Sequence, residues 1–130
     1  MKIVDEKTKI FGVLRIFTRV VRTFFRAENV CRRLHGDLSS IHGRRISARM
    51  RRMMKKRGGK KLAWIGVWRP WRSGKYQNVD QTPMDYSRFG RGQCKKRGRW
   101  CVAMNMQTGR WTSQNCNRKL PFVCKSCQRP

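Results

Sequence analysis

Arginine and lysine carry the most evident chemistry in this sequence: 33 of them stand against 6 aspartates and glutamates, a formal charge of +27 at pH 7. An arginine guanidinium group can form two parallel hydrogen bonds to the oxygens of a sulfate, phosphate or carboxylate group. A dense array of cations also releases the counterions that are condensed on a polyanion. Sixteen of the 33 cations fall into two clusters, which are Arg44, Arg45, Arg49, Arg51, Arg52, Lys55, Lys56, Arg57, Lys60 and Lys61, and then Arg88, Arg91, Lys95, Lys96, Arg97 and Arg99. A charge run is often only a solvated face, but so one-sided an excess favours a polyanion-binding function.

Six cysteines form the second chemical feature. Such a number suits a disulfide framework in an oxidising compartment. The rival chemistry is zinc, because Cys124-Lys-Ser-Cys127 is a C-x-x-C pair, to which Cys94 and Cys101 would add two further ligands. One C-x-x-C without a second pair of matching spacing is a weak indication of zinc, so the metal remains only as an alternative.

Catalytic patterns are missing from the sequence. It shows no Ser, His and Asp constellation, no G-x-S-x-G motif, no paired carboxylates and no phosphate-binding loop. The two histidines, His35 and His42, fall near predicted helix ends, where histidine is more often structural or solvated than catalytic. We therefore expect a binding protein without a cofactor rather than an enzyme.

Two helices and a strand are expected to position the first basic cluster. Residues 11–18 alternate as a strand does, and Thr23 could cap a helix that ends at Leu34. A second helix is predicted over residues 44–56, with an apolar stripe and basic residues elsewhere around it. The stripe consists of Ile46, Met50, Met53 and Met54. Gly58 and Gly59 then end this helix.

Short strands separated by Gly, Pro, Asn and Ser are expected in the second half. Their sequences are LAWIGVW, KYQNVD, CVAMN, RWTSQN and LPFVCK, of which the third and fourth form a hairpin. Residues 81–100 contain few strand signals and are numerous enough for a functional loop. The predicted class is therefore α+β, with two helices, antiparallel sheets and a long loop.

Two tryptophans in this half allow two interpretations. Trp68 and Trp71 flank Arg69 and Arg72. If exposed, the two indole rings would stack on sugars or enter a lipid headgroup layer, and if buried, they would be ordinary sheet packing.

Several ordered motifs between Phe17 and Lys125 resemble the C-type lectin-like fold. The segment TFFRAENVCRRLHGDLSSIH is similar to its first helix and the turn that follows, and WIG at residues 64–66 is similar to its core motif. GKYQNVDQTPMDYSRF is similar to the family pattern G-x-W-x-W-S-D-G-T-P-x-D-Y-x-N-W, and LPFVCK to the terminal strand. The departures from that pattern are Tyr76, Asn78, Val79, Gln81, Arg88 and Phe89.

This resemblance implies a fold stapled by two disulfides, Cys31 to Cys124 and Cys101 to Cys116. It also implies an N-terminal extension over residues 1–10, a lectin-like domain over 11–127 and a tail over 128–130. Cys94 and Cys127 stay unassigned, although snake venom members join two subunits through a cysteine in the long loop. We therefore predict an intermolecular disulfide at Cys94 as a hypothesis.

The resemblance also identifies a lost calcium site. Sugar-binding members hold calcium with a Glu-Pro-Asn or Gln-Pro-Asp motif in the long loop and a Trp-Asn-Asp on the next strand. This chain has Gln93-Cys94-Lys95 and Trp111-Thr112-Ser113 there. Because calcium takes about six to eight oxygen ligands, several of them carboxylates, we expect binding that does not depend on calcium.

The high charge resembles the eosinophil major basic protein subgroup, secreted cationic toxins, and residues 64–70 resemble eggshell matrix lectin-like proteins. We expect an extracellular or secretory-granule protein that binds heparin-like sulfated glycans or anionic membranes in defence, and an acidic pro-segment could shield it. The alternatives are a matrix protein that binds mineral or acidic glycans, and a lectin with a non-standard sugar site. Nucleic acid would explain the charge but not the cysteines. Met1 to Thr18 does not resemble a signal peptide, so we expect a removed signal or a longer precursor.

Overall fold

The computed structural model describes residues 2–5, 10–59, 61–71 and 74–127, and it describes side chains from residue 13 to residue 126 within these ranges. The helices are α1 (Phe24–Arg33) and α2 (Arg44–Lys56). The strands are β1 (Lys2–Asp5), β2 (Ile10–Arg22), β3 (Gly36–Leu38), β4 (Leu62–Arg69), β5 (Gln77–Asn78), β6 (Trp100–Asn105), β7 (Trp111–Gln114) and β8 (Leu120–Cys127).

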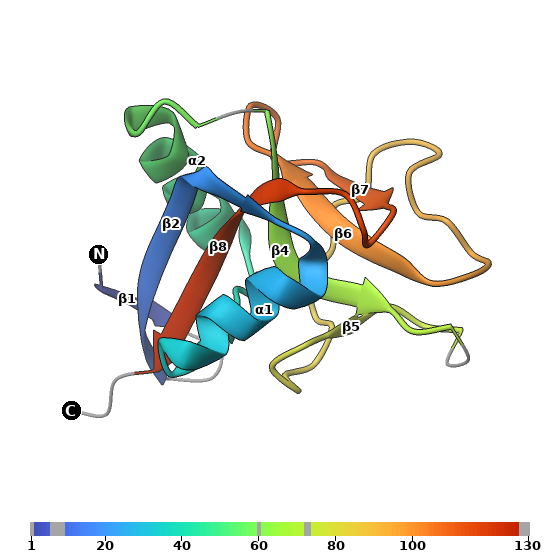
Figure 1. Ribbon diagram of the computed structural model, residues 1–130, viewed down its shortest axis with the longest axis horizontal. Coiled ribbons are helices and arrows are strands. Elements are labelled where there is room, and N and C mark those ends of the chain that lie inside the picture. The colour runs from blue at the N-terminus through green and yellow to red at the C-terminus, as the bar shows by residue number, and fades with distance from the viewer. Residues whose placement is uncertain (1, 6–9, 60, 72–73, 128–130) are drawn as a thin grey trace.

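All the strands join one sheet, whose main order is β1-β2-β8-β4-β6-β7, with β3 paired to β8 and β5 paired to β4. The sheet is mixed rather than purely antiparallel, because β4 and β8 run parallel where Trp64 lies opposite Phe122. The prediction of antiparallel sheets was therefore wrong at this pair, since LAWIGVW and LPFVCK are joined through other strands and need no hairpin between them. Figure 1 shows β2 and β8, from the two ends of the chain, side by side.

The two helices pack against opposite faces of this sheet. Successive residues of a strand point to opposite faces. On β4, Trp64 belongs to the apolar cluster that contains α1, whereas Ala63 and Ile65 belong to the cluster that contains α2. The outer side of α2 is left to solvent, which is where its basic residues lie.

Gly66 explains why the WIG motif ends in glycine. Its amide donates to the carbonyl oxygen of Ser39 at 2.7 Å, and a Cβ at this position would lie 2.1 Å from the carbonyl oxygen of Leu38. Any side chain would therefore push the 38–39 segment away from β4. Gly66 also accepts a hydrogen bond from the amide of Val79 at 2.9 Å, which brings the start of the long loop to the same strand.

Both disulfides implied by the resemblance are present. Cys31 of α1 is bonded to Cys124 of β8, with Cα atoms 5.3 Å apart, and Cys101 of β6 is bonded to Cys116, with Cα atoms 5.1 Å apart. Because two of the four cysteines considered for zinc are used in these bonds, the zinc alternative was wrong. Cys94 is free and exposed, and the side chain of Cys127 lies outside the described residues.

Several boundaries differ from the sequence-based ones. Helix α2 has the predicted bounds, while the first strand extends to Arg22, and Thr23 precedes α1 without a side-chain capping bond. The expected strand KYQNVD shrinks to Gln77 and Asn78, because the Asn78 side chain donates to the carbonyl oxygen of Pro83 at 3.0 Å and turns the chain. Residues 2–5 pair with β2, so the division between extension and domain at residue 11 stays a prediction. No helix among the described residues is long and apolar enough to span a membrane.

Candidate polyanion-binding surface

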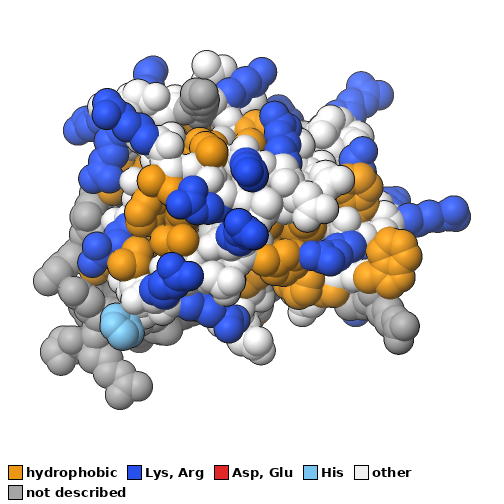
Figure 2. All heavy atoms as spheres, in the orientation of Figure 1, with side chains coloured by type: hydrophobic (Ala, Val, Ile, Leu, Met, Phe, Trp, Pro, Cys, Tyr) orange, Lys and Arg blue, Asp and Glu red, His pale blue; other side chains and the backbone are white. Residues whose placement is uncertain are grey.

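Every fully exposed position of helix α2 carries a basic side chain. It buries Ile46, Ser47, Met50 and Met54, and no acidic residue occupies its first turn. The predicted cations of this helix and its exit, Arg44, Arg45, Arg49, Arg52, Lys55, Lys56, Arg57 and Lys61, are exposed. Figure 2, drawn from the side on which α1 lies, shows basic side chains scattered over that face too, with no acidic side chain in view.

Arg51 is the half-buried exception, and it organises the surface between α2 and the turn from β6 to β7. Its Nε donates to the carbonyl oxygen of Met106 at 3.2 Å, and its Nη2 donates to that of Gln107 at 2.6 Å. A Cβ at Gly109 would lie 3.1 Å from Nη1, so the guanidinium lies flat against this glycine. Arg51 is thereby fixed in place before any ligand arrives.

Two pockets share Arg51 as a common wall. The smaller one, of about 220 Å³, is lined by Arg44, Ser47, Ala48, Arg51, Tyr86, Arg88, Thr108 and Gly109. The larger one, of about 520 Å³, is lined by Ala48, Arg51, Arg52, Met54, Lys55, Gly59, Lys61, Met106 and Gln107. Neither lining contains an aspartate or glutamate. We call the smaller pocket the three-arginine pocket, because Arg44, Arg51 and Arg88 converge on it from α2 and from the long loop.

A buried arginine holds the backbone of the long loop through hydrogen bonds, and the cations of the loop face the solvent. Arg69 is only 7% exposed, and its guanidinium donates to the carbonyl oxygens of Gly98 and of Lys96, the latter at 2.6 Å. At the start of the loop, the amide of Trp111 donates to the carbonyl oxygen of Arg88 at 2.8 Å. The predicted loop cations Arg88, Arg91, Lys95, Lys96, Arg97 and Arg99 are all exposed.

The residues at the predicted lost calcium site bond to one another and to Tyr76. The Tyr76 hydroxyl lies 2.5 Å from Ser113 Oγ and donates to the carbonyl oxygen of Lys95 at 2.7 Å. Ser113 Oγ in turn accepts from the Lys95 amide at 3.3 Å. Burial raises the pKa of Tyr76, so its hydroxyl stays neutral. Calcium does not fit these residues, because they supply no carboxylate and bring a lysine instead.

A Ser, His and Asp constellation does exist in the structure, contrary to the sequence-based expectation. His42 Nδ1 lies 2.6 Å from Asp85 Oδ1, and His42 Nε2 lies 3.1 Å from Ser40 Oγ. No short motif reveals it, because its members lie up to 45 positions apart and meet only through the fold.

This constellation does not present a nucleophile. Ser40 is 0% exposed, and its hydroxyl donates to Asp80 Oδ2 at 2.5 Å rather than to the imidazole. Lys125 Nζ also reaches Ser40 Oγ at 3.1 Å. Because a catalytic serine must face its base and its substrate, this network serves to tie the segment before α2 to the long loop.

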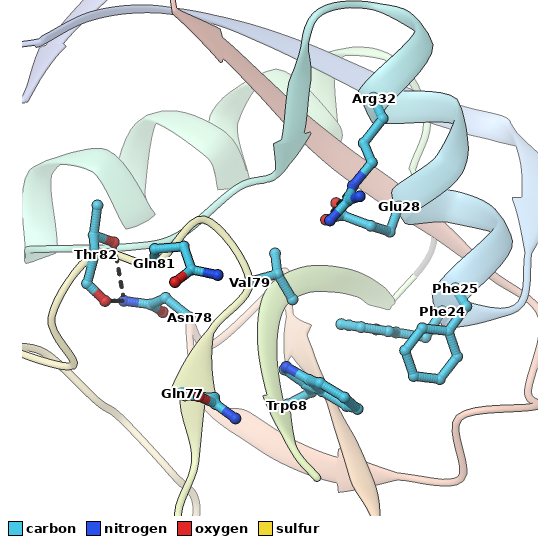
Figure 3. Close-up of a pocket in the computed structure, with 10 residues that line it drawn as sticks. All are labelled: Phe24, Phe25, Glu28, Arg32, Trp68, Gln77, Asn78, Val79, Gln81 and Thr82. Carbon is cyan, nitrogen blue, oxygen red and sulfur yellow. Dashed lines mark hydrogen bonds and ion pairs between the residues drawn. The ribbon is translucent and has the colours of Figure 1, made fainter.

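A third hollow, of about 360 Å³, has different chemistry (Figure 3). Phe24, Phe25 and Trp68 form an aromatic wall, and the other lining residues are Glu28, Arg32, Gln77, Asn78, Val79, Gln81 and Thr82. Glu28 Oε2 lies 3.4 Å from Arg32 Nε, and burial raises the pKa of Glu28 to about 7. Because it carries a carboxyl group and few cations, this hollow is not suited to a polyanion.

This hollow and the grouping of residues in the three-arginine pocket were not predicted from the sequence. Three departures from the family pattern, Asn78, Val79 and Gln81, line the hollow, so their clustering was an available signal. The structure brings Arg88 of the second basic cluster to Arg44 and Arg51 of the first, which the spacing could not show. Lys60 lies outside the described residues.

Comparison with known proteins places these features in context. A family model described as "Lectin C-type domain" matches residues 20–126. "Bone marrow proteoglycan" of Homo sapiens is 31% identical over 129 residues, which cover 92% of this chain and 58% of the relative. "Proteoglycan 3" of Mus musculus is 30% identical over 111 residues, 84% of this chain and 50% of the relative. "Snaclec EMS16 subunit beta" of Echis multisquamatus is 29% identical over 114 residues, 85% and 70% of the two chains.

Solved structures show the same fold. A structure of human lithostathine superposes with a TM-score of 0.81 at 23% identity, covering 90% of this chain and 92% of the other. A calcium-independent type II antifreeze protein superposes with a TM-score of 0.79 at 18% identity, covering 97% and 91%. This chain spans about half the length of the two proteoglycan relatives.

Proposed function

The chain belongs to the C-type lectin domain family, and we propose on that premise that it binds polyanions through its basic surface and without calcium. We propose two ligands. One is a heparin-like sulfated glycan, bound on α2, and the other is the surface of an anionic membrane. The lost calcium ligands and the excess of 33 basic over 6 acidic residues support this proposal. The protein would act in defence, as the resemblance to cationic lectin-like toxins implies.

The three-arginine pocket is the observation that carries the proposal. A sulfate group needs several hydrogen-bond donors and positive charge at one point, and planar guanidinium groups supply both. Arg51 is already fixed by two carbonyl oxygens, so it loses little conformational freedom when a ligand binds. The hydroxyl of Thr108 adds a neutral donor to the same pocket. The larger pocket beyond Arg51 offers a neighbouring position for the next sulfated unit.

Location and assembly are proposed on related grounds. The two disulfides support secretion or storage in a secretory granule, because such bonds persist in oxidising compartments. The snake venom relatives are named as subunits, and the exposed, free Cys94 supports a disulfide-linked dimer. An acidic pro-segment would shield the basic surface until release.

Titration with a size-defined heparin oligosaccharide tests the pocket. We expect Arg44→Gln and Arg88→Gln each to weaken binding by about tenfold, because a hydrogen bond to a charged group contributes about 1.5–3 kcal/mol. Arg91→Gln is the matched control, since Arg91 is exposed on the same loop but does not line the pocket. Removing the sulfate groups from the oligosaccharide should abolish the difference between the pocket variants and the control. Equal losses in all three variants would mean that binding is diffuse and would refute the pocket.

A further inference from the structure

The end of the molecule opposite α2 combines one exposed tryptophan and several partly buried aromatic rings with cations. Trp71, just after β4, is 71% exposed, more than any other large apolar side chain among the described residues. A Cβ at Gly98 would lie 3.9 Å from Trp71 Cζ3 and 3.4 Å from Trp100 Nε1, so both indole rings lie close to this glycine. The Trp100 Nε1 donates to the carbonyl oxygen of Arg97 at 2.5 Å, which leaves no unmet donor on that ring.

Cations lie directly over the rings of this end. Lys95 Nζ is 4.8 Å from the centre of the Trp100 ring, and the guanidinium of Arg99 is 4.5 Å from the centre of the Phe25 ring. Phe25 meets Trp68 edge to face, with ring centres 5.3 Å apart. Figure 2 shows hydrophobic and basic side chains side by side at this end, and Figure 1 places α2 at the other. We call Trp71, Trp100, Lys95, Arg97 and Arg99 the aromatic-cationic tip.

The backbone under this tip is held by hydrogen bonds from partly buried side chains. The buried guanidinium of Arg69 holds the carbonyl oxygens of Lys96 and Gly98, and Arg69 lies on β4 only two residues before Trp71. The Tyr76 hydroxyl holds the carbonyl oxygen of Lys95 at 2.7 Å. One arginine therefore fixes the loop that bears the cations to the strand that leads to the exposed tryptophan.

We propose that the aromatic-cationic tip is the part of the protein that contacts an anionic lipid surface. Tryptophan prefers the boundary between headgroups and acyl chains, because its ring is apolar and its N–H is polar. Lysine and arginine beside such a ring pair with lipid phosphate and carboxylate groups at the same depth. This inference rests on the part of the proposed function that concerns membranes. It assigns membrane binding to residues outside the three-arginine pocket.

A lipid surface fits this tip better than a glycan does. A sugar needs polar groups that converge on a ring, whereas here the Trp100 N–H is bonded internally and Trp71 stands out from the surface. An exposed ring that projects among cations instead suits a flat, negatively charged partner with an apolar layer beneath it. The molecule would then hold glycan at one end and lipid at the other.

Co-sedimentation with vesicles tests this assignment. We expect the intact protein to bind vesicles of phosphatidylserine mixed with phosphatidylcholine, and Trp71→Ala to reduce that binding by about tenfold, because the variant loses the indole ring that would bury apolar surface in the lipid. The same variant should keep its affinity for heparin, and Arg88→Gln should show the reverse pattern. Val21→Ala is the control, since it removes exposed apolar surface on β2, outside the tip.

Lipids with bromine in the upper acyl chain give a second readout. They should quench part of the tryptophan emission of the intact protein and less of that of Trp71→Phe, in which the partly buried Trp100 is the only tryptophan left in the tip. Vesicle binding that is unchanged in Trp71→Ala, or a heparin affinity that falls with vesicle binding in that variant, would overturn the inference. Heparin binding without any vesicle binding would overturn it and leave the glycan half of the proposed function standing, whereas binding to neither would overturn the proposed function itself.

Discussion

Glu28 shows what a single buried carboxyl group does in so basic a protein. It lies on α1, accepts a hydrogen bond from the Leu38 amide at 2.7 Å, and is 6% exposed. Burial, and after it the nearby Asp37, raise its pKa from 4.5 to about 7, while the Leu38 amide and Arg32 oppose the shift. The folded protein therefore holds a proton on Glu28 at pH values where the unfolded chain has already lost it.

This proton makes stability depend on pH. Between pH 4.5 and about pH 7, Glu28 binds more protons in the folded state than in the unfolded state. The contribution of Glu28 to the free energy of unfolding therefore falls as the pH rises through this range. We predict that Glu28→Gln, which is neutral at every pH, shows a smaller loss of stability from pH 5 to pH 8 than the intact protein does. Urea unfolding at a series of pH values measures the difference. The same slope in both proteins would contradict the position of this pKa.

Individual residues also mark the limits of sequence-based reasoning. The missing calcium ligands at Gln93-Cys94-Lys95 could be identified from residue types alone. The contact of the Tyr76 hydroxyl with Ser113 could not be predicted, because it joins residues 37 positions apart. The network of Ser40, His42 and Asp85 could not be predicted for the same reason.

At the scale of elements, local patterns predicted α2 well and the long loop poorly. Helix α2 follows from apolar spacing and from Gly58, whose φ of 68° suits glycine at a helix end. The loop takes its course from distant contacts instead, such as the bridge between Phe89 and Trp111. Because that bridge brings Arg88 toward α2, the three-arginine pocket depends on tertiary structure that no local pattern encodes.

The same loop presents Cys94 to solvent. The neighbouring Gln93 is tied down on both sides, since its amide donates to Gly90 at 3.0 Å and its carbonyl oxygen accepts from Ser113 at 3.0 Å. An exposed thiol on a fixed loop can meet the same thiol of a second copy in an oxidising compartment. We predict a disulfide-linked dimer on non-reducing electrophoresis, at a higher yield when heparin screens the repulsion between two basic chains.

Cys94→Ser is the matching variant and should run as a monomer while keeping both internal disulfides. A wild-type protein that stays monomeric under oxidising conditions, with Cys94 titratable, would contradict this prediction.

At the scale of the whole molecule, the described acidic side chains are occupied within the fold. Asp80 accepts from the Thr82 amide at 3.0 Å, Asp85 pairs with His42, and Glu28 and Asp37 both lie near Arg32. The basic surfaces of α2 and the aromatic-cationic tip are thus left to external anions. Self-repulsion at +27 opposes folding, and the bridge from Cys31 to Cys124, 93 positions apart, offsets it by about 4–5 kcal/mol in the chain-entropy account.

The fold of the whole molecule was within reach of the sequence, because motifs such as WIG and LPFVCK occupy positions that the sheet requires. Gly66 must be glycine to let β4 approach Leu38, and Phe122 of LPFVCK lies opposite Trp64 in the parallel pair. The division of the cations between two ends of the molecule was not within reach. This division depends on how the long loop returns across the sheet, and it could not be predicted from the two basic clusters in the sequence.

Binding to immobilised heparin across a salt gradient, in calcium and again in EDTA, tests the central claim most directly. We predict that the protein elutes at the same high salt concentration in both buffers, because cations displaced from the polyanion drive binding and no calcium takes part. Retention that is lost in EDTA, or that a neutral sugar competes away, would show a calcium-dependent lectin and would contradict the claim.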